Sequence, residues 1–347
     1  MYLVTNGRLI TRDPDGKGYY EHGAVAYEGS QIVEVGEESA LRAKYADAEI
    51  IDAKGGVIMP ALINAHTHIY SALARGLSIV GNNPTNFYEV LDGTWWAIDR
   101  HLMMDGTRAS ATALYMDSIK QGVTTIFDHH ASYGEIPGTL HTIAEESKRL
   151  GLRSCLCYEV SDRDGEEKCL QAIQENADFI SECEKNKDPM LAAMFGGHAL
   201  FTISDKTFDR MVEANNGRTG YHIHVSEGMN DVYDSLQNYG RRPVQRLQDH
   251  GILGEKTILG HCIHVNTAEM EIIKETGTMV VNNPESNMGN AIGICPVLQL
   301  HKRGILLGMG TDAYTNDMLE SLKVALCSQR SQNCLPNVGW CEGTDML

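Results

Sequence analysis

The sequence predicts an α/β protein, a (β/α)8 barrel of the TIM type with a small N-terminal β-sandwich portion. Two observations favour this fold class. From Val57 onward, short apolar segments alternate with longer amphipathic segments, and the alternation repeats eight times. The residues before Val57 lack this alternation and form short strand-like segments punctuated by glycines. We therefore expect two parts, residues 1–56 and residues 57–347, of which the second forms the barrel.

The N-terminal part is predicted to consist of short strands joined by turns. Gly7, Gly23, Gly29 and Gly36 punctuate these strands, as glycines do in hairpin turns. The expected strands are Tyr2–Val4, Arg8–Ile10, Ala24–Tyr27, Gln31–Val35 and Glu49–Asp52.

The barrel part is predicted to contain eight strands with helices between them. Several strands are continuous apolar runs, which is typical of parallel strands that are buried on both faces. The expected strands are Val57–His66, Val123–Asp128, Leu152–Tyr158, Met190–Phe195, Tyr221–Val225, Thr257–His261, Thr278–Asn282 and Ile305–Thr311. The expected helices include Asp105–Gln121, Gly138–Leu150, Cys169–Lys185, Ser204–Ala214, Val244–His250 and Thr267–Glu275.

The connection between the first two barrel strands is long. Residues 78–104 of this insertion contain Phe87, Tyr88, Trp95 and Trp96. These aromatic side chains could form a lid or the wall of a pocket, or they could pack the loop onto the rim of the barrel. Trp95 is the candidate among them for a substrate contact.

Charge and composition exclude several kinds of partner. The formal net charge of -17 disfavours nucleic acids and anionic membranes, because both would repel the chain. No segment approaches the ~18 apolar residues that a membrane-spanning helix needs. The N-terminus lacks the basic start and the apolar core of a secretion signal. The nine scattered cysteines are typical of reduced thiols, so we expect a cytoplasmic protein.

Residue types that bind metals lie at the ends of four predicted strands. His66 and His68 end the first, and residues two apart on a strand point to the same side. His224 ends the fifth strand, His261 the sixth and Asp312 the eighth. In barrels of this kind the C-terminal strand ends meet at one rim, which carries the active site. The sequence therefore predicts a metal site at that rim.

These residue types also predict a chemistry. Imidazoles together with a carboxylate suit zinc or ferrous iron and leave a position for water, whose pKa the metal lowers toward neutrality. Asp312 could bind the metal and accept the proton of the water. Glu227, three residues after His224, could carry a proton to the substrate. His261 could orient the water or polarise the group under attack.

Other residues near the strand ends have open roles. His222 faces the same side as His224 and could compete as the ligand, although its deeper position favours a core residue. Asn287, after the seventh strand, could contact the substrate or cap a turn. His129 and His130 follow the second strand, where a solvated loop is the favoured interpretation and a place in the pocket the alternative. His264 is expected to begin the next helix.

Five short segments carry the signature of a known family. They are Asn64–His68, His224–Glu227, Gly260–His261, Asn283–Asn287 and Gly310–Asp312. With them the sequence resembles the amidohydrolase superfamily, in the branch of aminohydrolases that includes guanine deaminase, S-adenosylhomocysteine deaminase and the triazine hydrolases. Within that branch, residues 282–290 are most similar to a poorly characterised group that is linked to selenium-dependent purine metabolism.

The resemblance implies one divalent metal ion, zinc or iron, with Glu227 and His261 close around it. The implied ligands are His66, His68, His224 and Asp312. It also places a substrate-contacting histidine at the exit of the fourth strand, where His198 lies, and a plain rim histidine is the alternative for His198. Binuclear relatives bridge two metals through a carboxylated lysine at that exit. Residues 191–198 contain no lysine, which favours a site for a single metal.

One departure concerns the end of the chain. Families of this type close the small β-sandwich with strands that follow the barrel. This chain ends 35 residues after Asp312 without such strands. We therefore expect a truncated sequence, with a naturally short member as the alternative.

The sequence thus predicts a metal-dependent hydrolase of C–N bonds in cyclic amidines, which deaminates an amino-substituted heterocycle by metal-activated water. Purines are one candidate class of substrate. Halide displacement from a related heterocycle, or hydrolytic opening of its ring, is the alternative reaction. A non-catalytic relative that keeps the barrel for binding or assembly is a third interpretation, but such relatives tend to lose ligands. The expected partner is the small heterocyclic substrate, with no nucleic acid or membrane, and a homodimer is the default assembly.

Overall fold

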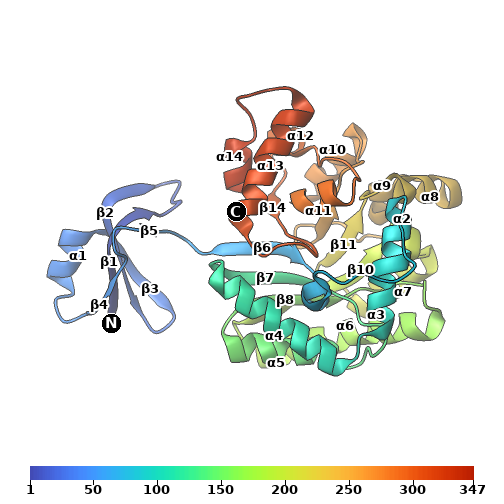
Figure 1. Cartoon of the computed structure of the whole chain (residues 1–347), viewed down its shortest axis with the longest axis horizontal. Helices are drawn as coiled ribbons and strands as arrows, with labels where there is room; N and C mark the ends of the chain where they lie inside the picture. Colours follow the sequence, from blue (N-terminus) through green and yellow to red (C-terminus); the bar gives the residue numbers. More distant parts are fainter. The chain divides into compact units, whose positions relative to one another are not determined.

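The computed structural model describes residues 1–347, which divide into two compact units, Met1–Ala61 and Leu62–Leu347 (Figure 1). The division falls later in the chain than residue 56. The reason is that β5 (Val57–Ile58) pairs with the first strand of the N-terminal unit. The predicted strand Val57–His66 is therefore two strands, and only its second part, β6 (Leu62–Thr67), belongs to the larger unit.

The N-terminal unit is a five-stranded sheet with one helix against it. Besides β5, its elements are β1 (Tyr2–Ile10), β2 (Tyr19–Glu28), β3 (Gln31–Glu37), α1 (Glu38–Lys44) and β4 (Glu49–Asp52). The strand order is β3-β2-β1-β4, with β5 also paired to β1. The β1–β2 and β2–β3 pairs are antiparallel, whereas β4 and β5 pair with β1 in parallel. Leu41 of α1 packs on Leu3, Ala24 and Ala26 in a small core.

The glycines of this unit form turns only in part. Gly29 turns the chain between β2 and β3 with a φ of 57°, as predicted. Gly7 and Gly23, by contrast, pair with each other inside β1 and β2, and Gly36 lies within β3. The two predicted strands on either side of Gly7 are therefore one strand with an irregular register.

The larger unit contains two parallel sheets. Besides β6, its strands are β7 (Val123–His130), β8 (Arg153–Tyr158), β9 (Leu191–Ala193), β10 (Phe195–Ala199), β11 (Tyr221–Val225), β12 (Ile258–His261), β13 (Met279–Asn282) and β14 (Leu307–Met309). One sheet has the order β6-β7-β8-β9 and the other β10-β11-β12-β13-β14. Isolated parallel bridges join Thr67 to Asp312 and Val160 to Gly197. The predicted alternation of helices with parallel strands is confirmed.

The fourth predicted barrel strand, Met190–Phe195, is broken in two. Its first part, β9, pairs with β8, while β10 pairs with β11 and continues to Ala199. The buried side chain of Asn176 lies at the break, where its Oδ1 accepts hydrogen bonds from the backbone N–H groups of Tyr158 (2.9 Å) and Gly196 (3.0 Å). This amide satisfies groups that an unbroken strand would pair.

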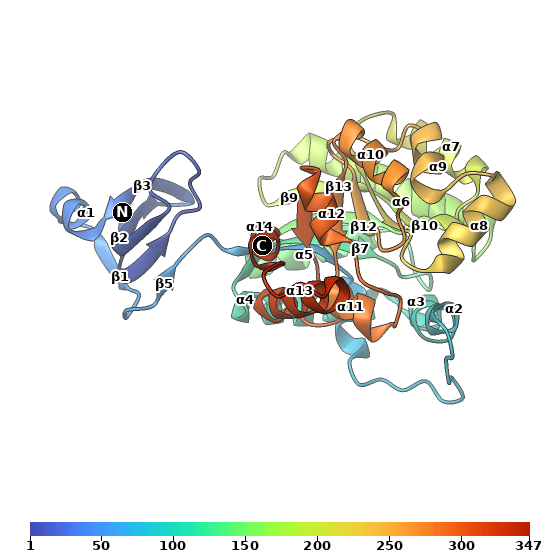
Figure 2. The same ribbon diagram turned by 90° about the horizontal axis from the view of Figure 1, so that it is seen from above.

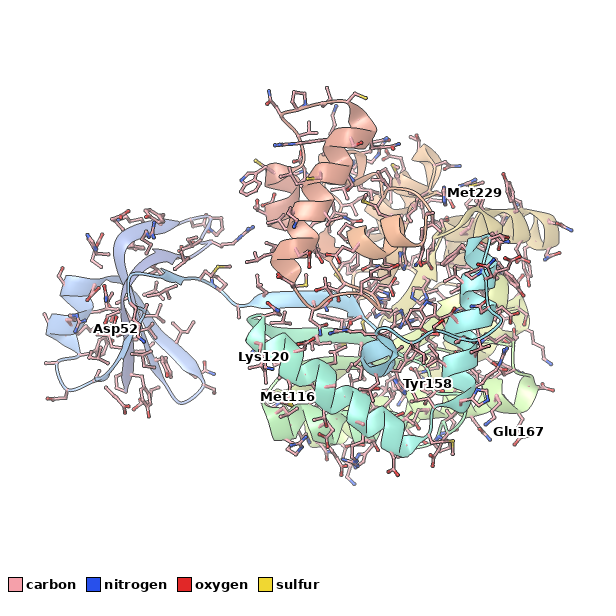
Figure 3. The ribbon with its side chains drawn as sticks, viewed as in Figure 1. Asp52, Met116, Lys120, Tyr158, Glu167 and Met229 are labelled. Atoms are coloured by element: carbon pink, nitrogen blue, oxygen red, sulfur yellow. The ribbon has the colours of Figure 1, made fainter.

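Helices surround the strands of this unit in both views (Figures 1 and 2). The six predicted helices occur as α4 (Met104–Lys120), α5 (Thr139–Leu150), α6 (Glu166–Asn186), α7 (Asp205–Asn215), α9 (Pro243–Asp249) and α10 (Thr267–Thr276). Further helices are α8 (Met229–Tyr239), α11 (Pro284–Gly289), α12 (Val297–Lys302), α13 (Met318–Asn333) and α14 (Trp340–Asp345). Met116 and Lys120, labelled in Figure 3, lie on the exposed side of α4.

The long insertion after β6 is held against the loop that follows β8. It contains the helical turn η1 (Ile69–Ala74), α2 (Phe87–Val90), the π-helical turn η2 (Leu91–Trp95) and α3 (Trp96–His101). Asp99 of α3 forms a buried ion pair with Arg163 at 2.5 Å, and the Arg163 guanidinium lies 5.1 Å from the ring centre of Trp96. This pair fixes the aromatic part of the insertion.

The main core of the larger unit lies between its strands and helices. Leu114 and Tyr115 of α4, Ile143 of α5 and Phe208 of α7 are among its fully buried side chains. No helix is both long enough and apolar enough to cross a membrane. All nine cysteines are free thiols, as the sequence predicts.

Candidate metal centre and pocket

Histidine side chains from β6, β11 and β12 meet an aspartate that follows β14. His66 lies in β6 and His68 just beyond it, while His224 lies in β11 and His261 ends β12. Asp312 follows β14 and pairs with β6 through the bridge to Thr67. All five side chains are buried. The structure therefore brings together every residue that the sequence placed at the rim.

The candidate ligand atoms of these side chains lie in overlapping groups of three. Nε2 of His68 lies 3.1 Å from Oδ1 of Asp312 and 3.3 Å from Nε2 of His224. Candidate ligand atoms of His66, His68 and Asp312 lie within 4.8 Å of one another, and so do those of His66, His224 and His261. Such spacing is that of atoms around one small cation.

Hydrogen bonds on the far side of the rings fix the orientation of two histidines. Nδ1 of His68 donates to the backbone carbonyl of His129 at 2.6 Å, and Nδ1 of His224 donates to the carbonyl of His198 at 2.7 Å. A proton on Nδ1 leaves the Nε2 lone pair of each ring free toward the centre. Metal-binding histidines in proteins are oriented in this way.

His66 supplies the clearest sign that a cation belongs here. Its Nδ1 lies 2.8 Å from Nε2 of His222, but its own Nε2 is buried without a hydrogen-bond partner. Orphaned buried polar atoms are rare in folded proteins. Burial, together with the charge of neighbouring histidines, lowers the pKa values of His66 and His224 well below their usual range. Both rings are therefore neutral, as metal ligands must be.

Asp312 is held ionised. Burial raises its pKa, but hydrogen bonds from His68 and from the Ser286 hydroxyl (2.5 Å to Oδ2) outweigh burial and leave the pKa below its usual value. The converse holds for His68, since burial lowers its pKa but the carboxylates of Asp312 and Glu159 raise it to about 9. When no cation is bound, protonated His68 thus forms an ion pair with Asp312.

Glu227 and His261 lie beside this centre. Nε2 of His261 is 3.5 Å from Oε1 of Glu227 and 3.6 Å from Oδ2 of Asp312. Burial, and next the charge of Asp312, raise the pKa of Glu227 well above its usual value. This shift favours the protonated form of the Glu227 carboxyl group. Such a carboxyl group can serve as a general acid.

Left-handed backbone conformations place several of these side chains. Ser226, His261 and Asp312 have φ values of 49°, 70° and 56°. For residues other than glycine such values cost about 1–2 kcal/mol each, and they concentrate at functional sites. Here they turn the chain sharply at the exits of β11, β12 and β14.

A pocket opens next to the metal centre, with a free volume of about 30 Å³. Trp95 and His198, two predicted substrate contacts, line it together with Phe87 and Trp96. The insertion therefore forms a wall of the pocket. Asn287 lies elsewhere, because its Oδ1 is 2.8 Å from Nδ1 of His261, behind that ring.

Two expectations about histidines were wrong. His129 and His130 are fully buried and belong to β7, which runs two residues past its predicted end. His264 precedes α10, whose N-cap is Asn266, and its Nε2 donates to the carbonyl of Ile292. His222 is a core residue beneath His66, as favoured.

The sequence also left Glu159 out of the candidate set. Glu159 follows directly after Tyr158, the last residue of β8, which Figure 3 labels. Its side chain is buried, lines the pocket and accepts a hydrogen bond from Nδ1 of His129 at 3.0 Å. A carboxylate at the exit of a predicted strand is the same signal that identified Asp312, and it could have found Glu159.

Parallel strands that carry histidines and a carboxylate at their C-terminal ends, next to a pocket, define a metal-dependent hydrolase of the α/β class. Residues 57–340 match the amidohydrolase family, and the chain belongs to that family. The donor set fits a single divalent ion such as zinc.

Individual relatives agree with this assignment. A 5'-deoxyadenosine deaminase of Methanosarcina barkeri is 30% identical over 328 residues, which cover 93% of this chain and 72% of the relative. The structure of guanine deaminase from C. acetobutylicum with bound guanine superimposes with a TM-score of 0.84, at 17% identity over 99% of this chain and 83% of that one. Zinc-bound atrazine chlorohydrolase from Arthrobacter aurescens superimposes with a TM-score of 0.83, at 21% identity over 100% of this chain and 83% of that one.

Proposed function

We propose that this protein is an aminohydrolase that deaminates an amino-substituted heterocycle of the purine class. The observation that carries the proposal is the position of the Glu227 carboxyl group, which lies beside His261 and Asp312 and lines the same pocket as the metal centre. A metal site that only stabilises a fold needs no proton donor of this kind. Relatives named 5'-deoxyadenosine deaminase and 5-methylthioadenosine/S-adenosylhomocysteine deaminase support the substrate class.

Within this proposal, His66, His68, His224 and Asp312 hold one divalent ion. When bound there, zinc or iron would lower the pKa of a water molecule toward neutrality. No lysine lies in β9 or β10, which supports a single-metal site.

The residues of the chain then move the protons. Asp312, which is ionised, accepts the proton that water loses on attacking the ring carbon bonded to the amino group. Glu227 donates its proton to the adjacent ring nitrogen, and His261, held by Asn287, orients the attacking oxygen. The proton on Asp312 passes to the amino group, the C–N bond breaks and ammonia leaves, while the hydroxyl proton of the intermediate returns to Glu227 as the C=O bond forms. The substrate thereby exchanges its amino group for oxygen.

The proposal extends to the architecture. The two sheets would close into a (β/α)8 barrel through the Thr67–Asp312 and Val160–Gly197 bridges. The sheet of the N-terminal unit would be one layer of a small β-sandwich, which is supported by exposed apolar side chains such as Ile32 and Ile50. We further propose a cytoplasmic location and a homodimer, the commonest symmetric assembly.

The test removes the proton of Glu227 without changing its shape. Glu227→Gln should keep its metal and its unfolding temperature but release ammonia from purines about 100- to 10,000-fold more slowly, which is the usual contribution of a positioned acid. Metal content by mass spectrometry and ammonia release over a panel of heterocycles check this. Chloride release from halogenated rings without any ammonia release would contradict the proposal. A folded protein that binds no zinc or iron would instead favour a non-catalytic relative.

A further inference from the structure

The proposed mechanism leaves the Glu159 carboxylate unused, although it lines the pocket. Its side chain is only 2% exposed, and its ion-pair partners are all histidines. Oε1 lies 3.0 Å from Nδ1 of His129 and 3.4 Å from Nδ1 of His68. Nε2 of His129 lies 2.9 Å from the carbonyl oxygen of His222, so both of its ring nitrogens have partners within the protein. Glu159 is thus a positioned acceptor with Oε2 directed away from His129.

Its neighbour His198 presents a second acceptor. The Thr202 hydroxyl donates its only proton to the carbonyl of Ala199 at 2.8 Å. The hydrogen bond of 2.9 Å between His198 and that hydroxyl must therefore be donated by Nδ1 of His198. With its proton on Nδ1, the neutral ring exposes a lone pair at Nε2.

The two acceptors lie side by side at the pocket. Nε2 of His198 is 3.9 Å from Oε2 of Glu159, which is too far for a hydrogen bond between them. Both residues line the pocket next to Trp95 and Trp96. Because the two atoms are too far apart to pair with each other and both residues line the pocket, the pair is suited to a ligand that supplies donors.

We propose that Glu159 and His198 form a specificity element for heterocycles with an amino group, or two neighbouring N–H groups, in addition to the amino group that leaves. This inference rests on the proposed function and narrows its substrate class. The aromatic side chains of Trp95 and Trp96, which line the same pocket, can pack against a flat ring. A hydrogen-bonding site of this kind rejects an analogue that lacks the donor, because the buried acceptors are then left unpaired.

The experiment compares two substrates that differ by one amino group. Metal-loaded enzyme should deaminate 2,6-diaminopurine with a kcat/KM about tenfold or more above that for adenine, as expected for a hydrogen bond to a charged acceptor. Glu159→Gln should reduce this ratio to within about threefold of unity. The matched control is Glu175→Gln, since Glu175 is a buried carboxylate of α6 that accepts from the backbone of Gly138 and Leu140 outside the pocket. It should keep the wild-type ratio.

Equal ratios in the wild type and in Glu159→Gln would overturn the inference. If Glu159→Gln does not fold, Glu159→Asp replaces it, because it keeps the charge but withdraws the oxygens, and an unchanged ratio would again overturn it. Adenosine and 2′,3′-dideoxyadenosine test the sugar as an alternative source of donors. One further outcome would overturn the inference. In it, the wild type prefers adenosine to 2′,3′-dideoxyadenosine, Glu159→Gln loses this preference, and the ratio of 2,6-diaminopurine to adenine stays the same.

A binding measurement separates this inference from the proposed function. Hypoxanthine and xanthine cannot lose an amino group, and xanthine carries a further ring N–H. Quenching of tryptophan fluorescence should give wild-type protein a Kd for xanthine about tenfold below that for hypoxanthine, and Glu159→Gln should lose the difference. If the two Kd values differ in this way but no substrate is deaminated, the proposed function alone is contradicted. Equal Kd values in wild type would contradict the inference alone.

Discussion

At the scale of single residues, the hydrogen bonds on the outer side of the histidine rings determine which ring nitrogen faces the centre of the site. The carbonyls of His129 and His198 fix protons on Nδ1 of His68 and His224, so both Nε2 atoms face the centre. The orphaned Nε2 of His66 faces no partner within the protein. Loss of one ring therefore removes a positioned nitrogen from the centre.

We expect His224→Ala to lose bound metal and at least about 1,000-fold of the activity, since removing a ligand opens the coordination shell. Metal content by mass spectrometry and ammonia release check this. His141→Ala is the matched control, because His141 is an exposed histidine of α5 paired only with acidic side chains at the surface. A His224→Ala protein with full metal content would contradict the ligand assignment.

At the scale of elements, the helices that support the strands are joined by buried charges. Glu146 of α5 accepts hydrogen bonds from Arg108 (2.9 Å) and Thr112 (2.8 Å) of α4 and from Arg149 of its own helix (2.5 Å). Its partners, chiefly Arg149, lower the pKa of Glu146 to about 2. This carboxylate thus connects the two helices that cover β7 and β8.

The sign of the pH dependence follows from that shift. A carboxyl group with a lowered pKa in the folded state adds stability above its unfolded pKa, and the contribution is lost as pH falls through the folded value. Glu146→Gln should therefore reduce the free energy of unfolding by about 1–2 kcal/mol at neutral pH, and the difference should shrink between about pH 5 and pH 2. Urea unfolding at several pH values measures it. A difference that grows toward acid pH would contradict this role.

At the scale of the whole larger unit, the metal site joins distant parts of the chain. His66 and His68 come from the first strand of one sheet, His224 from the other sheet, and Asp312 follows the last strand. A cation bound by all of them stabilises the folded state alone, because the unfolded chain does not hold these ligands together.

Removal of the metal should consequently lower the unfolding temperature. Zinc at 100 times its Kd adds about 2.7 kcal/mol to the free energy of unfolding. Calorimetry before and after dialysis against a chelator, and again after zinc is restored, should show a reversible loss. His224→Ala should show a much smaller response. An equal response in that variant would indicate that the stabilising ion binds elsewhere.

Much of the fold and of the site could be predicted, because the strands and the positions of the site residues follow from patterns among residues that are close together in the sequence. The apolar runs define strands, and the two-residue period of a strand places His66 and His68 on the same side. The rule that strand ends carry the site then located His224, His261 and Asp312. Gly7 and Gly23 misled the prediction, because glycine permits a turn but also permits the close pairing of two strands.

By itself, then, the sequence determined the fold class and the residue types at the rim, since strand and helix periodicities are properties of neighbouring residues. Only the tertiary structure decided which side chains complete the pocket. The burial of His129, the place of Asn287 behind His261 and the acceptor pair of Glu159 and His198 arise from contacts between segments far apart in the chain. Such contacts depend on packing in three dimensions, and no periodicity along the chain encodes them.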